Sequence, residues 1–227
     1  MPAVIFVRHG QASFGAADYD RLSTRGVEQA NVAAQHLLRE RAEVDVAVSG
    51  ALGRQRATAE PIAAALRCEL EIDSRWDEYD ADQILTHHST SSVRQQRAPG
   101  SEAPEVSSRE FQDVLERAVL DWIAAGTATP AAESWPRFSE RVSSALADLC
   151  RRLSSGQTAL VCTSGGVLAV LCTRLLSVPD PTFVAFNRVT VNAGITRVLL
   201  GRSGATLLSF NEQAHLLCDG SSLVSYR

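Results

Sequence analysis

Short apolar runs alternate with longer amphipathic stretches along most of the chain. The runs at 4–7, 44–49, 68–72, 159–163, 195–200 and 206–211 are rich in β-branched residues and predict strands. Stretches with apolar residues at helical spacing predict helices at about 24–38, 54–66, 108–123, 134–153 and 165–176. This alternation predicts an α/β fold, a three-layer α/β/α sandwich with a mainly parallel central sheet.

Individual residues set the expected helix boundaries. Ser23 or Thr24 is expected to cap the first helix, and Ser134 a later one that stops at Gly156. Pro61 falls inside the second helix and is expected to kink or reset it. The first helix should bury one apolar face, formed by Val27, Ala30, Ala34, Leu37 and Leu38.

The chain between the third and fourth strands predicts a mostly helical cap, inserted at about residues 76–135 of a single domain spanning 1–227. Residues 86–108 lack periodicity and are rich in Ser, Gln, Arg, Pro and Gly, which predicts a long loop or a partly ordered lid. A capping box at 107–110 then opens a helix. Its apolar stripe is interpreted as core packing rather than a cofactor site, and comprises Phe111, Val114, Leu115, Ala118, Val119, Trp122 and Ile123.

Composition narrows the class of protein. The 227 residues carry a net charge of -4, with 45% hydrophobic and 21% charged residues, which is ordinary for one globular domain and argues against a nucleic-acid binder. The first residues enter a strand without a basic leader, and no apolar stretch is long enough to span a membrane. The odd number of cysteines, in apolar contexts without metal-ligand spacing, suggests buried thiols in the cytoplasm; they are Cys68, Cys150, Cys162, Cys172 and Cys218.

Three predicted strands end on residues suited to phosphate. Arg8, His9 and Gly10 follow the first strand, residues 49–54 follow the second, and a small-residue turn at 163–166 opens a helix after the fourth. A guanidinium binds phosphate oxygens, neutral imidazole attacks phosphorus, and a helix N-terminus favours an anion. An Arg-His pair is also common in solvated loops, so these residues alone leave the function open.

Six segments in order along the chain resemble the histidine phosphatase superfamily, the phosphoglycerate mutase-like group. They read V-R-H-G-Q-A at 7–12, L-S-x-x-G-x-x-Q-A at 22–30, S-x-x-L-x-R-x-x-x-T-A at 49–59, D-E-Y-D at 77–80, E-S-W-x-x-F-x-x-R-V at 133–142 and S-G-G-V-L at 164–168. They span nearly the whole chain, and it is their combination that is specific.

The resemblance implies a role for each matching residue. His9 would be the nucleophile, Arg8 and Arg54 would clamp the phosphoryl oxygens, and Glu78 would donate a proton. Gln11, Ser164 and Gly165 would complete the phosphate site, with neither metal nor cofactor.

Two of these assignments have simpler alternatives. Arg54 could be an exposed helical arginine, and Glu78 could belong to a merely solvated acidic loop. If Glu78 is the acid, repulsion from Asp77, Asp80 and Asp82 is expected to raise its pKa.

Ser164 departs from the family pattern, which normally has a second histidine in S-H-G-G. A hydroxyl donates a hydrogen bond but carries no imidazolium charge, so reduced activity is expected. Ser164→His should leave turnover unchanged, or raise it if the pocket accepts the ring. The remaining histidines are poor substitutes by position: they are His36, His87, His88 and His215.

The leading functional prediction is a phosphomonoester hydrolase acting through a phosphohistidine on His9. A phosphoglycerate mutase-type phosphotransferase and a low-turnover phospholigand-binding regulatory protein are the alternatives. The expected partner is a small phosphorylated substrate or inorganic phosphate, with neither nucleic acid nor membrane. The physiological substrate and the oligomeric state stay open at this point.

Overall fold

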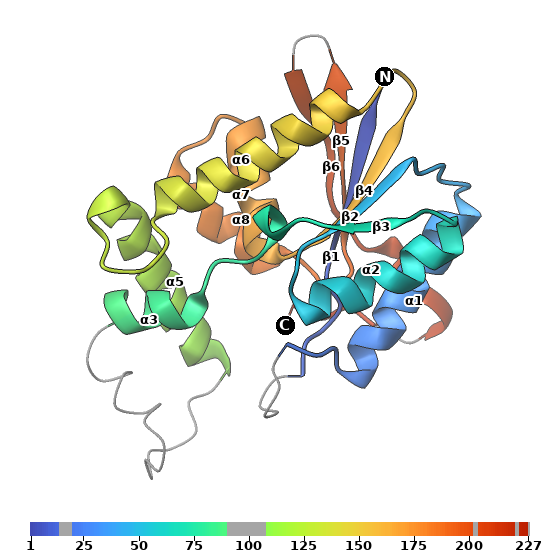
Figure 1. The fold of residues 1–227 in the computed structure, drawn as a ribbon. Coiled ribbons are helices and arrows are strands. Elements are labelled where there is room, and N and C mark those ends of the chain that lie inside the picture. Colours follow the sequence, from blue (N-terminus) through green and yellow to red (C-terminus); the bar gives the residue numbers. More distant parts are fainter. Residues whose placement is uncertain (14–19, 90–107, 202–203, 221–222, 227) are drawn as a thin grey trace.

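A six-stranded sheet forms the centre of the molecule (Figure 1). The computed structural model describes residues 1–13, 20–89, 108–201, 204–220 and 223–226. The order of the strands is β3-β2-β4-β1-β5-β6. Their bounds are β1 Ala3–Arg8, β2 Val46–Ser49, β3 Leu70–Ile72, β4 Thr158–Thr163, β5 Ile195–Gly201 and β6 Gly204–Glu212.

The mainly parallel sheet predicted from the sequence is confirmed. β4 lies between β1 and β2 and pairs parallel with both, and β2 pairs parallel with β3. The last two strands run antiparallel: β5 pairs with β1, and β6 with β5. Because β1, β2 and β4 are adjacent and parallel, the segments that follow them emerge at one edge of the sheet.

Helices cover both faces of the sheet, as predicted (Figure 1). Alternate side chains of β1 show the division, since Val4 and Phe6 join one buried cluster and Ile5 and Val7 the other. α1 and α2 pack on the face of Ile5, and α6 and α7 on the face of Val4. The helix bounds are α1 Thr24–Arg39, α2 Gly53–Leu66, α3 Ala81–His88, α5 Ser108–Ala125, α6 Trp135–Arg152, α7 Gly165–Leu175 and α8 Phe183–Val189.

The chain between β3 and β4 is mostly helical. It begins with the short 3-10 helix η1 (Ser74–Trp76), continues through α3, α5 and a second short 3-10 helix, η2 (Gly126–Ala128), and returns to the sheet through α6. Figure 1 shows α3 and α5 together beside the sheet. The predicted stripe of α5 does pack into the core, where Trp122 meets Trp135 edge to face with ring centroids 5.5 Å apart.

Several local predictions need correction in this region. The loop expected from Thr86 begins later, because α3 continues to His88. The rest of that predicted loop, at 90–107, lies outside the described residues, and so does Ser107 of the predicted capping box. Ser134 occupies the N-cap of α6, but its side chain makes no capping hydrogen bond. That helix ends at Arg152, and Gly156 lies in the following turn with φ of 87°.

The first two helices also differ from expectation in detail. Ser23 caps α1 by accepting a hydrogen bond from Gly26 N, as predicted, but Val27 and Leu38 are 50% and 45% exposed. The buried face is instead built on small residues and Gln29, which let the helix lie close to its neighbours. Pro61 lies inside α2 without ending it, because the adjacent Ile62 and Ala63 are held in the core.

The thiols are only partly as expected. Cys162 and Cys172 are buried, whereas Cys68 and Cys150 are half-buried; all four are free. The side chain of Cys218 lies outside the described residues. None of the helices in the described part of the chain has the length and apolarity that crossing a membrane requires.

Candidate functional site

The site is built where β1, β2 and β4 end. His9 N donates to Thr163 O at 2.8 Å, and Gly50 N donates to Cys162 O at 3.1 Å, so the segments after the three strands are tied together. The N-terminus of α7 begins directly after β4, in the middle of this group. The convergence expected from the sequence is therefore present.

His9 is buried at this edge with a defined tautomer. Its Nε2 lies 3.3 Å from Arg54 Nε, which is always a donor, so Nε2 carries the lone pair. The ring proton is then on Nδ1, which donates to Gly10 O at 2.7 Å. Burial, reinforced by the charges of Arg8 and Arg54, holds the pKa of His9 well below its ordinary value of 6.5. The imidazole is neutral near pH 7 and presents its nucleophilic nitrogen to Arg54.

Arg54 reaches His9 from the first turn of α2. Asp20 positions it in two ways: its carboxylate accepts from Gly53 N at 2.5 Å at the start of the helix, and it pairs with Arg54 Nη1 at 2.7 Å. The side chain of Arg54 is only 11% exposed, which excludes the alternative of a solvated helical arginine.

Arg8 is the last residue of β1 and directly precedes His9 in the sequence. Its Nη1 donates to the carbonyls of Thr190 and Tyr226, the latter at 3.0 Å. Its Nε lies 3.4 Å from the place that a Cβ on Gly165 would occupy. Arg8 therefore adjoins the first turn of α7, and its charge acts on His9 together with that of Arg54.

Glu78 is partly buried against the N-terminus of α7. Its Oε2 accepts from Gly166 N at 3.0 Å, and its Oε1 from Tyr79 N at 3.2 Å. Burial raises the pKa of Glu78 above its ordinary value of 4.5, although Gly166, Arg54 and Arg8 oppose the rise. The sequence had suggested that repulsion from the neighbouring aspartates would raise this pKa. The structure shows that desolvation raises it instead.

The segment that carries Glu78 is held by buried and charged partners. The carbonyl of Trp76 accepts from Thr163 Oγ1 at 2.6 Å and from Gln55 Nε2 at 3.0 Å. Arg141 Nη1 donates to the carbonyls of Arg75 and Asp77, each at 2.9 Å, while the rest of its guanidinium pairs with Glu133. Glu78 is therefore fixed in place from both sides.

The three predicted phosphate-binding residues occupy different positions. Ser164 is fully buried at the N-cap of α7, where its Oγ accepts from Gln55 Nε2 at 2.8 Å. Gly165 is the first residue of α7 and adjoins Arg8. Gln11 follows His9 in the sequence, but its Oε1 accepts from Ser23 Oγ at 2.9 Å, so its side chain is directed to the start of α1.

Sequence reasoning did not single out four residues that support this site. Gln55 and Asp20 have been described above; Thr58 Oγ1 accepts from Gly10 N at 2.9 Å, and Asn192 Nδ2 donates to His9 O at 3.2 Å. Thr58 was visible within the motif at 49–59, where a polar residue in an apolar helix face was a usable signal. The other three residues are distant in the sequence from the groups that they bind, and none of the six segments specifies their residue type.

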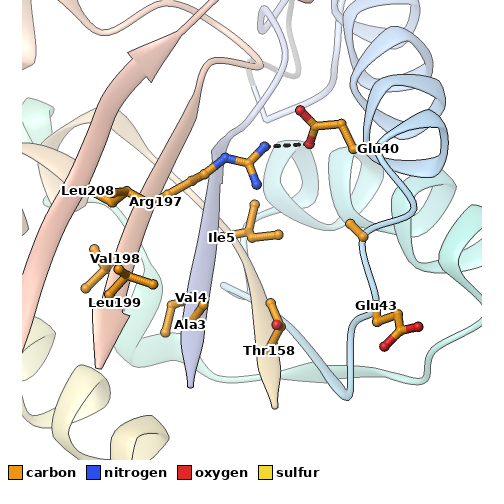
Figure 2. A pocket seen from close by; sticks show the side chains of 11 residues that line it. Ala3, Val4, Ile5, Glu40, Glu43, Thr158, Arg197, Val198, Leu199 and Leu208 are labelled. Atoms are coloured by element: carbon orange, nitrogen blue, oxygen red, sulfur yellow. Dashed lines mark hydrogen bonds and ion pairs between the residues drawn. The ribbon is translucent and has the colours of Figure 1, made fainter. Parts of the chain in front are cut away.

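Other polar clusters lie away from the site. His36 stacks on His215 at 4.8 Å between α1 and the 3-10 helix η4 (Ala214–Gly220), and His88 contacts Thr129. A pocket of about 230 Å³ lies at the opposite end of the sheet, where β1 and β4 begin, and Figure 2 shows Arg197 beside Glu40 there. Among the described residues, no group of three or more His, Cys, Asp or Glu side chains could hold a metal ion.

Comparison with known proteins identifies similar sequences and folds. The family profile described as histidine phosphatase superfamily (branch 1) matches residues 4–213. A probable phosphoglycerate mutase, GpmB, of Shigella boydii is 28% identical over 204 residues, covering 87% of this chain and 85% of the relative.

Solved structures share the fold at lower identity. A phosphoserine phosphatase mutant from Entamoeba histolytica, in complex with phosphoserine, aligns with a TM-score of 0.68 and 21% identity, over 96% of this chain and 100% of the other. A mycobacterial glucosyl-3-phosphoglycerate phosphatase aligns with a TM-score of 0.64 and 22% identity, over 93% and 99% of the two chains.

Proposed function

The chain belongs to the histidine phosphatase superfamily, and on that premise we propose that it hydrolyses small phosphomonoesters through a phosphohistidine on His9. The observation that carries the proposal is the environment of His9: a buried neutral imidazole whose Nε2 lone pair faces a guanidinium. An uncharged ring is the form that attacks phosphorus, and the arginine provides the positive charge that a phosphoryl group requires.

In the first step, His9 Nε2 attacks phosphorus as the ester oxygen leaves. The N–P bond forms, the P–O bond to the alcohol breaks, and Glu78 gives its proton to the departing oxygen. Arg54 must turn its Nε from His9 to a phosphoryl oxygen in this step, because both groups compete for the same nitrogen. The raised pKa of Glu78 favours the protonated form that the step needs.

In the second step, water attacks the phosphohistidine. The N–P bond breaks, inorganic phosphate forms, and the Glu78 carboxylate takes the proton of the attacking water. Nδ1 of His9 keeps its hydrogen bond to Gly10 O throughout, so the ring returns to its original tautomer. No further redox or group-transfer partner is needed for the atoms to balance.

Arg8, Arg54, Ser164, Gly165 and Gln11 form the proposed phosphate site. The two guanidiniums supply charge, and the first turn of α7 supplies backbone N–H groups at the positive end of its dipole. Ser164 supplies one neutral hydrogen bond in the place that the family gives to a histidine. Gln11 contributes from the loop after His9, once its side chain leaves Ser23.

The proposed cap, residues 76–135 of a single domain, would decide which phosphomonoester is accepted. It carries Glu78 at its start and packs α3 and α5 beside the catalytic edge (Figure 1). The phosphoserine and glucosyl-3-phosphoglycerate phosphatases that share the fold support a small phosphorylated substrate. Free thiols at Cys162 and Cys172 support a reducing compartment, the cytoplasm.

A mutase-type phosphotransferase is the second candidate, because the curated relatives that match this chain include a probable phosphoglycerate mutase. The two activities share the phosphohistidine and differ in its acceptor, which is water in the phosphatase and a hydroxyl of the reoriented substrate in the mutase. A product assay separates them: release of inorganic phosphate supports the phosphatase, and isomerised phosphoglycerate without phosphate release supports the mutase.

The decisive experiment is a panel of phosphomonoesters, including phosphoserine and 3-phosphoglycerate, tested with the wild type and His9→Ala. We expect the wild type to hydrolyse at least one of them and His9→Ala to be inactive. An alkaline, denaturing quench with radiolabelled substrate should trap a phosphoenzyme whose label is then lost in acid. Full activity of His9→Ala would refute the mechanism. Tight phosphate binding without turnover would favour the phospholigand-binding protein instead.

A further inference from the structure

Gln55 links three segments of the site through one fully buried amide. Its Nε2 donates to Ser164 Oγ at 2.8 Å and to Trp76 O at 3.0 Å, and its Oε1 accepts from Leu52 N at 3.3 Å. These partners belong to the turn after β4, the segment that leads to Glu78, and the start of α2. A residue next to Arg54 in the sequence thus holds together the elements that carry Ser164 and Glu78.

The hydrogen bond to Ser164 has a fixed direction. An amide nitrogen only donates, so Ser164 Oγ accepts from Gln55 and cannot direct its own proton there. Both hydrogens of Gln55 Nε2 are used, one on Ser164 and one on Trp76. The structure records no hydrogen bond from the Ser164 hydroxyl to another described residue. Because the side chain is fully buried, a phosphoryl oxygen can reach this proton only when neighbouring side chains move apart as the substrate binds.

We infer that Gln55 is a positioning residue, which by donating to Ser164 Oγ directs the serine proton toward a phosphoryl oxygen. This inference rests on the proposed phosphatase function, since it assigns Ser164 a donor role in that site. Ser164 directly precedes Gly165, which adjoins Arg8, and Gly166, whose N–H binds Glu78. The serine therefore binds the amide that orients it and directly precedes the two glycines that adjoin Arg8 and Glu78.

The same contact makes positions 55 and 164 interdependent. In a histidine variant at 164, the ring Cγ would stand near the present Oγ, 2.8 Å from Gln55 Nε2. Ordinary contacts between such atoms are about 3.5 Å, so the ring must take another direction or Gln55 must move. This contact corrects the expectation from the sequence, because the pocket has no room for the ring: Ser164→His alone should lower turnover, and adding Gln55→Ala should restore part of the loss by opening the space.

A double-mutant cycle tests whether Gln55 acts through Ser164. We expect Ser164→Ala to lower kcat about a hundredfold, as for loss of a transition-state donor, and Gln55→Ala about tenfold. In the Ser164→Ala background, Gln55→Ala should cost only about threefold more, because there is no hydroxyl left to orient and only the hydrogen bond to Trp76 O is lost. Equal factors in both backgrounds would overturn the inference and leave Gln55 with a structural role only.

Gln29 provides a matched control. It is also a fully buried glutamine and makes the same three kinds of hydrogen bond. Its Oε1 accepts from Gln11 N, and its Nε2 donates to Leu223 O and to Ser225 Oγ. Whatever Gln29→Ala costs in kcat should multiply with the effect of Ser164→Ala, because it does not touch that serine. The contrast separates a specific coupling from the general loss of a buried amide.

Gln55→Glu tests the direction of the hydrogen bond while keeping the shape of the side chain, should the alanine variant fail to fold. A carboxylate accepts, so the Ser164 hydroxyl would donate to it and turn away from the phosphate. We expect a larger loss of kcat in the Ser164 protein than in Ser164→Ala, where only the added charge and the lost hydrogen bond to Trp76 O act. An equal loss in the two would count against the inference.

Wild-type turnover and His9→Ala keep the two proposals distinguishable. If the wild type is no more active than His9→Ala, the phosphatase function fails, and this inference with it. If the wild type is active and His9→Ala is not, but the Gln55 and Ser164 effects simply multiply, only the positioning role is refuted. Vanadate and phosphate titrations add a binding readout, in which Gln55→Ala should weaken vanadate more than phosphate.

Discussion

Gly166→Ala should separate acid catalysis from phosphate binding. Gly166 donates its N–H to Glu78 Oε2, and a methyl group there would meet the other carboxylate oxygen, Oε1. The same methyl would stand 2.7 Å from Tyr79 Cε1 and 2.9 Å from Cδ1, whereas ordinary contact begins at 3.4 Å. The segment of Glu78 and Tyr79 must therefore retreat from α7 by roughly 0.7 Å or more.

Tyr79 has little room to absorb this movement. Its ring packs against Trp122, Phe138 and Phe183, with centroids 5.6, 5.7 and 6.1 Å away. The displacement thus falls mainly on the Glu78 carboxyl, and a misplacement of about 1 Å can cost about a hundredfold in rate. Overpacking of this kind should also lower the free energy of unfolding by about 1–3 kcal/mol, partly offset by the better helix propensity of alanine.

Two esters of different leaving group provide the assay. With an alkyl phosphate such as phosphoserine, we expect Gly166→Ala to lower kcat about a hundredfold. With p-nitrophenyl phosphate the loss should be under about tenfold, because its leaving group needs little protonation. Inorganic phosphate affinity, measured by thermal shift, should stay within about threefold, since Arg8 and Arg54 do not move. An equal loss on both esters would refute Glu78 as the acid.

Three further predictions test the supports of the site. Asp20→Ala should raise KM, because it removes the ion pair that positions Arg54, and should cost about 1 kcal/mol of stability, because α2 loses its N-terminal hydrogen bond. Asp20→Asn should recover the stability measured by denaturant unfolding, but not the wild-type KM. The pH profile of kcat/KM should be bell-shaped. On its acid limb His9 becomes protonated, and this limb lies below pH 6.5 because the pKa of His9 is lowered. On its alkaline limb Glu78 loses its proton, and this limb lies above pH 4.5 because the pKa of Glu78 is raised. A limb that persists in Glu78→Gln would belong to another group. Arg141→Ala should lower the unfolding free energy by about 2 kcal/mol and should also lower kcat, because it frees the segment that carries Glu78. Arg151 belongs to an exposed surface ion pair, so Arg151→Ala should change neither quantity.

The sequence by itself determined the layers and the edge at which the site lies. Strand and helix periods differ, so their alternation could be read directly, and parallel strands necessarily bring their ends to one edge. Arg8 and His9 follow β1 immediately, and the start of α7 follows β4 immediately. For such residues, position along the chain already fixes position in the fold, and the motif at 49–59 gave the same information for Arg54.

Only the tertiary structure decided how these groups are charged and held. The lowered pKa of His9 and the raised pKa of Glu78 both come chiefly from burial, which depends on what packs around them and not on their sequence neighbours. For the same reason Asp77, Asp80 and Asp82 were a misleading guide to Glu78.

The supporting contacts also depend on segments that are distant in the sequence. Asp20 meets the start of α2 from 33 residues away, and Gln55 meets Ser164 from 109 residues away. Such pairs produce no periodic pattern in the sequence, because a side-chain hydrogen bond requires only that the fold bring two groups within about 3 Å of each other. The sequence therefore named the groups that we propose to react, and the packing of the chain around them decided their protonation and orientation.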